Sequence, residues 1–271
     1  MKIHFISGLP RSGSTLLSAL LRQNPLIHAS MSSPVYTLFN ALLREMSQAG
    51  EYSLFIDDRQ RRRILRSCVE SYYEDIAPGR VVFDTNRLWT TKMAALANLF
   101  PDCRVICCVR NVAWVVDSLE SLARRNYLEP SRVFNFDPGG TVYNRADLIM
   151  AATGLVGSSL FALREAVFGF DSSRLLLVRY ETLTADPLGT LARIYDFINE
   201  PRYPHNPDRI EPAPGAAEFD ARLGMPGLHQ LGTSVHRQER RSILPTELFA
   251  RYEPFSFWEK PDEMPPGIHM V

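Results

Sequence analysis

The chain has 271 residues, 45% of them hydrophobic, and its 30 Lys and Arg side chains balance its 30 Asp and Glu side chains. This length and composition allow a sizeable core, and we expect a single domain over residues 1–271. The zero net charge excludes the global basic field of a non-specific nucleic-acid binder, so we expect no nucleic-acid partner and only local affinity for anions.

The N-terminus and the cysteines bear on the cellular compartment. Met1 and the residues after it lead directly into an apolar stretch, which leaves no room for a removable signal peptide. No apolar run reaches the roughly 18 residues that a membrane-spanning helix needs. Cys103, Cys107 and Cys108 lie in or beside a short apolar run, as reduced core thiols do. These features predict a cytoplasmic protein without a membrane span.

Residues 5–17 predict a strand, a phosphate-sized loop and a helix start in succession. Gly8 and Gly13 permit a tight turn that points N–H groups inward, and the helix N-terminus adds partial positive charge. The loop nearly fits the pattern G-x-x-x-x-G-K-[ST] of nucleoside triphosphatases, but Ser14 stands at the lysine position and Arg11 supplies the fixed charge. A guanidinium can hold a phosphate or sulfonate through two hydrogen bonds, so this loop predicts an anion site.

Strands alternate with helices along the rest of the chain. Continuous apolar runs predict buried strands at 81–83, 105–109 and 175–178. Apolar periodicity predicts helices at 35–49, 58–76, 90–100, 145–167 and 188–198. This alternation predicts an α/β fold with a mostly parallel central sheet flanked by helices, in which ligands bind beyond the carboxyl ends of the strands. The arginines from Arg59 to Arg66 are expected to form a solvated helix face.

A second anion-binding pattern follows the strand at 105–109. Arg110 leaves the strand end, and Asn111 and Ser118 are seven residues apart, or two helical turns, so they can share one helix face. The guanidinium of Arg110 and the hydroxyl of Ser118 are therefore predicted to meet one phosphate.

Together these motifs resemble those of sulfotransferases that use 3′-phosphoadenosine 5′-phosphosulfate (PAPS). The loop is similar to the 5′-phosphosulfate loop in the arginine-bearing version of tyrosylprotein and many bacterial members, and the pair of Arg110 and Ser118 is similar to their 3′-phosphate site. Residues 179–198 resemble the segment whose tyrosine lies near the adenine. The resemblance covers 3–25, 81–124, 174–198 and, more weakly, 227–252, and it implies a P-loop NTPase-like fold with PAPS as cofactor.

The resemblance also implies a set of cofactor-binding residues spread along the chain. A basic C-terminal loop closes the nucleotide site in related chains, so residues 201–271 are expected to be an irregular extension with that role. The expected cofactor contacts are Pro10, Arg11, Ser12, Gly13, Ser14, Thr15, Arg110, Ser118, Tyr180, Thr233, Ser234, Arg240 and Arg241. No metal is required, and no His/Cys cluster has ligand spacing.

Four residues are candidates for the chemical step. Sulfuryl transfer needs in-line attack by the acceptor and stabilisation of charge on the leaving 5′-phosphate, for which Arg11 is the candidate. Arg87 is placed to neutralise the sulfuryl oxygens. Asp84 or His229 would remove the acceptor proton, with Asp84 favoured slightly because it lies at a strand end. The alternatives are an N-cap or an ion pair with Arg87 for Asp84, and an ordinary loop histidine for His229.

The chain departs from its relatives where the acceptor is handled. It has Thr85-Asn86-Arg87 where tyrosylprotein members have Lys-Asp-Pro, and residues 30–33 lack the glutamate base of other members. Residues 126–150 are expected to form part of an acceptor lid or ordinary packing, through aromatic side chains at Tyr127, Phe134, Phe136 and Tyr143.

The sequence therefore predicts a PAPS-dependent sulfotransferase that acts on a hydroxyl or amine of a small metabolite or glycan. Two alternatives stay open at this point, a P-loop-type nucleotide kinase and a non-catalytic nucleotide-binding module. A kinase would need the helix lysine and a carboxylate that holds Mg²⁺.

Overall fold

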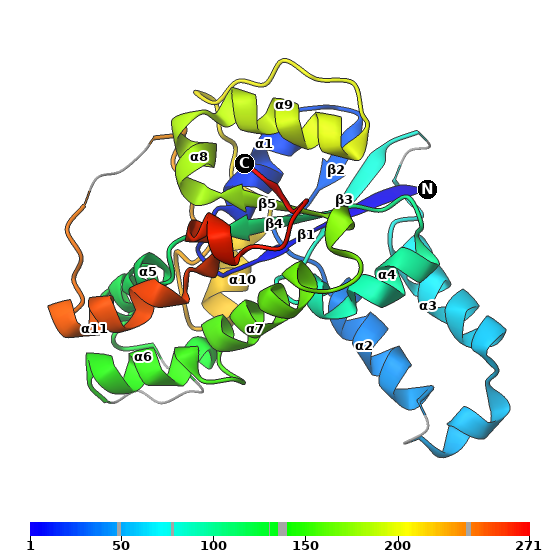
Figure 1. Cartoon of the computed structure of the whole chain (residues 1–271), viewed down its shortest axis with the longest axis horizontal. Helices are drawn as coiled ribbons and strands as arrows, with labels where there is room; N and C mark the ends of the chain where they lie inside the picture. The colour runs from blue at the N-terminus through cyan, green and yellow to red at the C-terminus, as the bar shows by residue number, and fades with distance from the viewer. Residues whose placement is uncertain (48–49, 77–78, 130, 135–139, 237–239) are drawn as a thin grey trace.

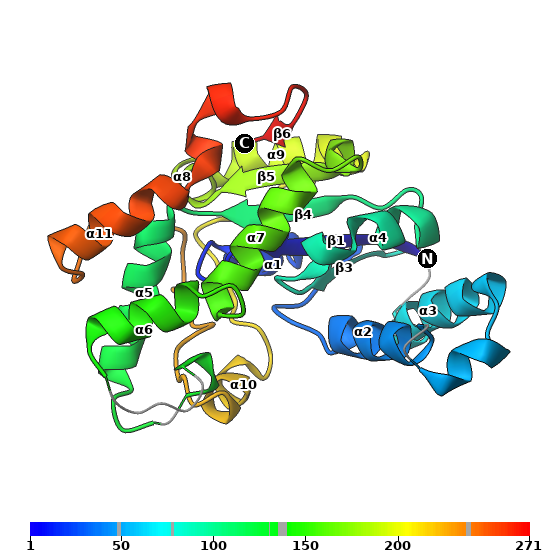
Figure 2. The same cartoon turned by 60° about the horizontal axis from the view of Figure 1, so that its bottom comes forward.

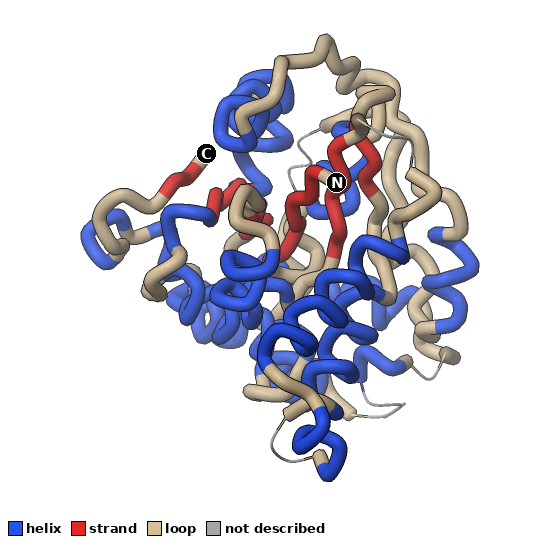
Figure 3. Tube along the Cα trace, turned by 90° about the vertical axis from the view of Figure 1, so that its right-hand side faces the viewer, coloured by secondary structure: helices blue, strands red, loops and turns tan. Residues whose placement is uncertain are grey.

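The computed structural model describes residues 1–271 apart from 48–49, 77–78, 130, 135–139 and 237–239. Six strands form one sheet in the order β2-β3-β1-β4-β5-β6, and every neighbouring pair is parallel (Figure 1). In Figure 3 the strands lie in the middle of the molecule with helices around them. The predicted α/β fold with a parallel sheet is confirmed.

The three continuous apolar runs of the sequence all lie in central strands. The central strands are β1 (Lys2–Gly8), β3 (Val81–Thr85), β4 (Val105–Val109) and β5 (Leu175–Arg179). All residues of β3 and β4 are buried, because helices cover both faces of the sheet. The sequence missed β2 (Ile27–Ala29) and β6 (His269–Met270), which are too short to show a pattern of their own.

The helices divide between the two faces of the sheet. The helices are α1 (Ser14–Leu21), α2 (Val35–Glu45), α3 (Asp58–Tyr72), α4 (Met93–Leu99), α5 (Val112–Arg125), α6 (Val142–Met150), α7 (Leu155–Val167), α8 (Tyr180–Ala185), α9 (Pro187–Ile198), α10 (Ala216–Arg222) and α11 (Thr246–Tyr252). Apolar residues of α1 and α9 form one core cluster, and those of α2 to α7 and α11 form the other. Of the helix expected at 35–49, residues 48–49 lie outside the described part.

The helix expected over 145–167 is two helices, α6 and α7 (Figure 2). Gly157 allows this break, because a Cβ there would lie 2.1 Å from the carbonyl oxygen of Ala151. By length and composition alone, Val142–Val167 is the one stretch among the described residues that qualifies as a membrane span. A single such stretch is weak evidence for a membrane span, because a core helix can have the same length and composition.

The C-terminal part of the chain contains more structure than its composition indicates. The proline-rich residues 201–214 are irregular, but α10, α11 and β6 follow them. Strand β6 pairs in parallel with β5, so the chain returns to the sheet at its end. Residues 228–236, between α10 and α11, lie at the carboxyl ends of the central strands.

Candidate active site

A cavity of about 750 Å³ opens at the carboxyl ends of the central strands. Residues that follow β1, β3, β4 and β5 line it, and residues 228–236 from the C-terminal part close it. Its size lies in the range of cavities that hold a nucleotide-sized ligand. The described lining contains Arg11, Arg87, Arg110 and Arg132 but no carboxylate, so the cavity favours an anion.

The turn between β1 and α1 is built around two glycines. Gly8 has φ +118°, and a Cβ there would lie 2.1 Å from the carbonyl oxygen of Cys108, so no larger residue fits. Gly13 has φ +99° and precedes α1. The backbone N–H groups of Gly13, Ser14 and Thr15 have no acceptor among the described residues. These donors and the helix N-terminus together make an anion site in the cavity.

Ser12 has a structural part in this turn. Its buried hydroxyl donates to the carbonyl oxygens of Leu9 and Cys108, the latter over 2.9 Å. The other loop residues expected to contact the cofactor line the cavity, whereas Ser12 does not. Its hydroxyl therefore holds the loop against β4.

Arg11 lines the cavity and connects the loop to two distant parts of the chain. Its φ of +58° places it in the left-handed region, where a non-glycine residue is strained. Its Nε donates to the hydroxyl of Ser118 over 3.1 Å, and its Nη1 donates to the carbonyl oxygen of Leu228. Burial, and then the charge of Arg110, lower the pKa of Arg11 to about 10. An anion bound beside these two cations would relieve their repulsion.

Arg110 lies next to Arg11. Its Nη1 donates to the backbone oxygen of Arg11 over 3.3 Å, and its guanidinium lies 4.2 Å from the ring centre of Tyr180. Its Nε is buried and has no hydrogen-bond partner among the described residues. The Tyr180 ring also packs against Gly13. Loop, tyrosine and both arginines therefore form one cluster around the cavity.

Ser118 lies on α5 behind this cluster. The sequence predicts that it shares a phosphate with Arg110, and the structure brings its hydroxyl to Arg11. Ser118 is buried and is not part of the described cavity lining. In this arrangement its hydroxyl supports the arginine that faces the cavity.

His229 and Asp220 form a hydrogen-bonded pair at the cavity wall. The backbone N–H of His229 donates to Asp220 over 2.8 Å, and Nδ1 of His229 lies 2.5 Å from the other carboxylate oxygen. Asp220 is only 1% exposed, whereas His229 lines the cavity. The pairing leaves Nε2 of His229 as the ring nitrogen without a partner among the described residues. Since Leu228 accepts from Arg11, the histidine follows directly on a residue tied to the phosphate loop.

Comparisons with known proteins agree with this geometry. A model of the sulfotransferase family matches residues 4–204. The chain belongs to the sulfotransferase family. Protein-tyrosine sulfotransferase 1 of Danio rerio is 23% identical to this chain over 207 residues, which cover 74% of this chain and 54% of the relative. The chain thus spans about half the length of that curated relative.

Solved structures show the same fold. The sulfotransferase domain from the curacin biosynthetic pathway has a TM-score of 0.52 and 20% identity, with 75% of both chains covered. Retinol dehydratase in a complex with retinol and PAP has a TM-score of 0.51 and 14% identity, with 97% of this chain and 82% of that chain covered. The P-loop NTPase-like fold of sulfotransferases is therefore confirmed for this chain.

Asp84 lies away from the cavity of this sulfotransferase. It is completely buried and accepts hydrogen bonds from Ser33 over 2.5 Å, from Tyr73 over 2.5 Å and from Nε1 of Trp89 over 2.6 Å. Burial raises the pKa of its carboxyl group. The sequence placed it among the catalytic candidates because it ends a strand, but the side chain points into the core. Arg87, by contrast, lines the cavity, and the carboxylate of Asp84 bonds to Ser33, Tyr73 and Trp89 instead of Arg87.

The C-terminal candidates separate into two groups. Thr233 and Ser234 line the cavity, and Ser234 lies 2.6 Å from Nε2 of His236. Arg240 and Arg241 do not line it. Arg240 pairs with buried Asp117 on α5 and lies over the ring of Trp114, and Arg241 is exposed.

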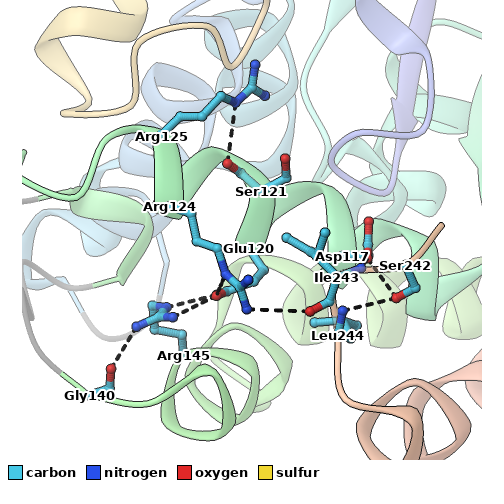
Figure 4. A network of polar contacts seen from close by, with 10 residues as sticks. All are labelled: Asp117, Glu120, Ser121, Arg124, Arg125, Gly140, Arg145, Ser242, Ile243 and Leu244. Carbon is cyan, nitrogen blue, oxygen red and sulfur yellow. Dashed lines mark hydrogen bonds and ion pairs between the residues drawn. The ribbon is translucent and has the colours of Figure 1, made fainter. Parts of the chain in front are cut away.

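A network of polar contacts fastens the C-terminal segment to α5 (Figure 4). Asp117 accepts from the hydroxyl of Ser242 over 2.8 Å and from the N–H of Ile243 over 2.7 Å. One turn further along the helix, Glu120 pairs with Arg124 and Arg145. Arg240 and its neighbours therefore anchor the segment that closes the cavity.

The expected aromatic lid does not reach the described cavity lining. Tyr127 is 74% exposed, Phe134 is buried in the core, and the hydroxyl of Tyr143 donates to Glu247. Phe136 lies outside the described residues. Val133 is the residue of this region that lines the cavity together with Arg132.

Proposed function

We propose that this chain transfers a sulfuryl group from PAPS to a hydroxyl group of an acceptor. The observation that carries the proposal is the shared cavity of Arg11, Arg110 and the N–H groups of the β1–α1 loop. Two cations and a helix N-terminus in a space without carboxylates match a donor with a phosphosulfate at one end and a 3′-phosphate at the other. Family membership supports the same reaction.

Each part of the cluster has a role in this reaction. The N–H groups of Gly13 to Thr15 bind the 5′-phosphate, and Arg11 stabilises the charge that develops there as the bond from sulfur to the bridging oxygen breaks. Arg110 binds the 3′-phosphate, and Tyr180 holds the guanidinium in place. Arg87 faces the sulfuryl oxygens. The products are the sulfated acceptor and 3′,5′-adenosine bisphosphate.

His229 is the general base in our proposal. As the acceptor oxygen forms its bond to sulfur, its proton passes to Nε2 of His229, and Asp220 holds Nδ1 so that the ring keeps its orientation and its resulting charge is balanced. The link from Arg11 to Leu228 places this base next to the residue that stabilises the leaving group. Asp84 is too far inside the core to take the proton.

The acceptor and the compartment belong to the proposal as well. The acceptor is a small metabolite or glycan, since the donor and one small molecule together fit the cavity volume of about 750 Å³. We further propose a cytoplasmic location, because Cys68, Cys103, Cys107 and Cys108 are all free thiols. A nucleotide kinase is disfavoured, because the described lining offers no carboxylate to Mg²⁺ and no lysine at Ser14.

A transfer assay tests the proposal. The protein is incubated with ³⁵S-labelled PAPS and a panel of phenols, alcohols, sugars and amines, and the ³⁵S label that moves to each acceptor is measured. We expect transfer to at least one hydroxyl compound and no hydrolysis of ATP with Mg²⁺. Donor binding without transfer to any acceptor would favour a non-catalytic module, and Mg²⁺-dependent ATP hydrolysis would favour a kinase.

A further inference from the structure

One wall of the cavity carries apolar side chains that the donor phosphates do not explain. Its members come from four separate elements, and each of them lines the cavity while it is only partly buried or exposed. We call these residues the apolar wall: Met31, Val133, Leu155, Phe219 and Leu223. Phe219, the largest of them, is 38% exposed. Exposed hydrocarbon inside a cavity indicates a site for an apolar ligand group.

One residue of the apolar wall lies beside the proposed base. The ring of Phe219 lies 5.6 Å from the ring of His229, measured between centroids. The N–H of Arg132 donates to the carbonyl oxygen of Leu223 over 3.1 Å, which joins α10 to the 3₁₀ helix at Arg132–Phe134. Figure 2 shows these two elements side by side. The hydroxyl that loses its proton to His229 therefore belongs to a molecule in contact with this wall.

Met31 of the apolar wall follows a different strand from the residues that bind the donor. The donor groups Arg110 and Tyr180 follow β4 and β5, and the phosphate loop follows β1. Met31 follows β2, at the opposite edge of the sheet order β2-β3-β1-β4-β5-β6. Met31 is thus separated in the sheet order from the donor groups, and we infer that it is available to the second substrate when the donor is bound.

We propose that the acceptor carries its hydroxyl on an apolar body, as an alkylphenol or a hydrophobic alcohol does. This inference rests on the proposed function and narrows its acceptor. A sugar would bring several hydroxyl groups against side chains that offer no hydrogen bonds, and each group that lost water without a new partner would weaken binding. A hydrocarbon body gains from the same contact.

A homologous series of acceptors tests the inference. With 4-methyl-, 4-ethyl-, 4-propyl- and 4-butylphenol, we expect kcat/KM to rise about fourfold for each added methylene, which corresponds to ~0.8 kcal/mol. Leu223→Ser and Met31→Ser should flatten this dependence while 3′,5′-adenosine bisphosphate still binds. The matched control is Phe170→Ser, because Phe170 is fully exposed and outside the cavity lining; it should leave the series unchanged.

The same measurements separate the two proposals. If the wild-type protein does not bind 3′,5′-adenosine bisphosphate, the proposed function itself fails. If it binds the nucleotide and transfers sulfate, but the alkyl series is flat or a sugar or an acidic tyrosine peptide is the better acceptor, only the apolar acceptor is wrong. Met31 lies in a loop, so its variant keeps the test valid should Leu223→Ser not fold.

Discussion

Nε of Arg11 donates a hydrogen bond to the hydroxyl of Ser118 over 3.1 Å, across 107 positions of the sequence. This bond joins the phosphate loop to α5. The neighbouring Asp117 joins the same helix to the C-terminal segment through Ser242. The loop, the helix and the segment therefore hold one another in place around the cavity. We expect substitutions of residues that do not contact the donor to change kcat/KM for PAPS.

Ser118→Ala tests this support directly. Loss of the hydroxyl leaves Nε of Arg11 without its partner, and we expect a cost of about 1 kcal/mol, or roughly fivefold in kcat/KM for PAPS. Ser121→Ala is the matched control, because Ser121 lies one turn further on α5 and only its backbone oxygen accepts a hydrogen bond. Equal rates for the two variants in the transfer assay would show that Ser118 does not position Arg11.

The histidine pair makes a prediction for the rate of transfer. Loss of the base in His229→Asn should lower kcat by about 10² to 10⁴. Asp220→Asn should also lower kcat, because the ring loses the partner that fixes Nδ1. Asp84→Asn is the comparison. If Asp84→Asn lowers kcat by this amount and His229→Asn leaves kcat unchanged, the base has been misassigned.

His4 predicts how stability depends on pH. Burial, then the charges of Lys2 and Arg104, lower its pKa from 6.5 to about 3, so native His4 stays neutral where the unfolded chain takes up a proton. Between about pH 6.5 and 3 the unfolded state binds more protons, so the free energy of unfolding falls by about 1.4 kcal/mol for each pH unit of acidification.

The variant His4→Asn isolates this contribution. Asn keeps an acceptor for the N–H of Arg104, which Nδ1 of His4 accepts over 3.0 Å. Urea unfolding at pH 7 and pH 5.5 should show a stability loss that is smaller by about 1 kcal/mol in the variant than in the wild type. An equal loss in both proteins would mean that His4 is protonated in the native state.

Gly8→Ala should be strongly destabilising. The added Cβ would meet the carbonyl oxygen of Cys108 at 2.1 Å, and φ at this residue is +118°. We expect a loss of more than about 3 kcal/mol, or failure to fold, because both the backbone and β4 must move. Gly215→Ala is the control, since it also has positive φ but nothing within 4 Å of the new Cβ, and it should cost about 1 kcal/mol. Similar thermal shifts for the two variants would argue against the clash.

Much of the fold and of the donor side follows from local patterns. The loop glycines predict the tight turn after the first strand. The apolar runs at β3, β4 and β5 predict the sheet, because buried parallel strands are apolar throughout. Arg110 could be found because it ends such a strand. The sequence could not show that the side chain of Asp84 points into the core. Alternate residues of one strand point to opposite faces, and the polar partners of Asp84 lie on other elements.

The acceptor side depended on contacts between distant segments. The sequence did not indicate a role for Asp220. The helix α10 that carries it is only seven residues long, and the hydrogen bond between Asp220 and His229 forms only in the folded chain. The apolar wall combines one or two residues from each of four separate parts of the chain, so no window of the sequence contains it. Arg240 has the charge of a phosphate ligand, but in the structure it pairs with Asp117 on α5, and the sequence gives no sign of this pairing.

The most direct measurement compares the affinities of 3′,5′-adenosine bisphosphate and adenosine 5′-monophosphate by calorimetry, in the wild type, in Arg110→Ala and in the exposed control Arg241→Ala. We expect the 3′-phosphate to improve binding at least tenfold in the wild type and in the control, because a charged hydrogen bond contributes about 1.5 kcal/mol or more, and to add nothing in Arg110→Ala. Equal binding of the two nucleotides by the wild type, or an unchanged preference in Arg110→Ala, would contradict the assignment of Arg11 and Arg110 to opposite ends of one donor.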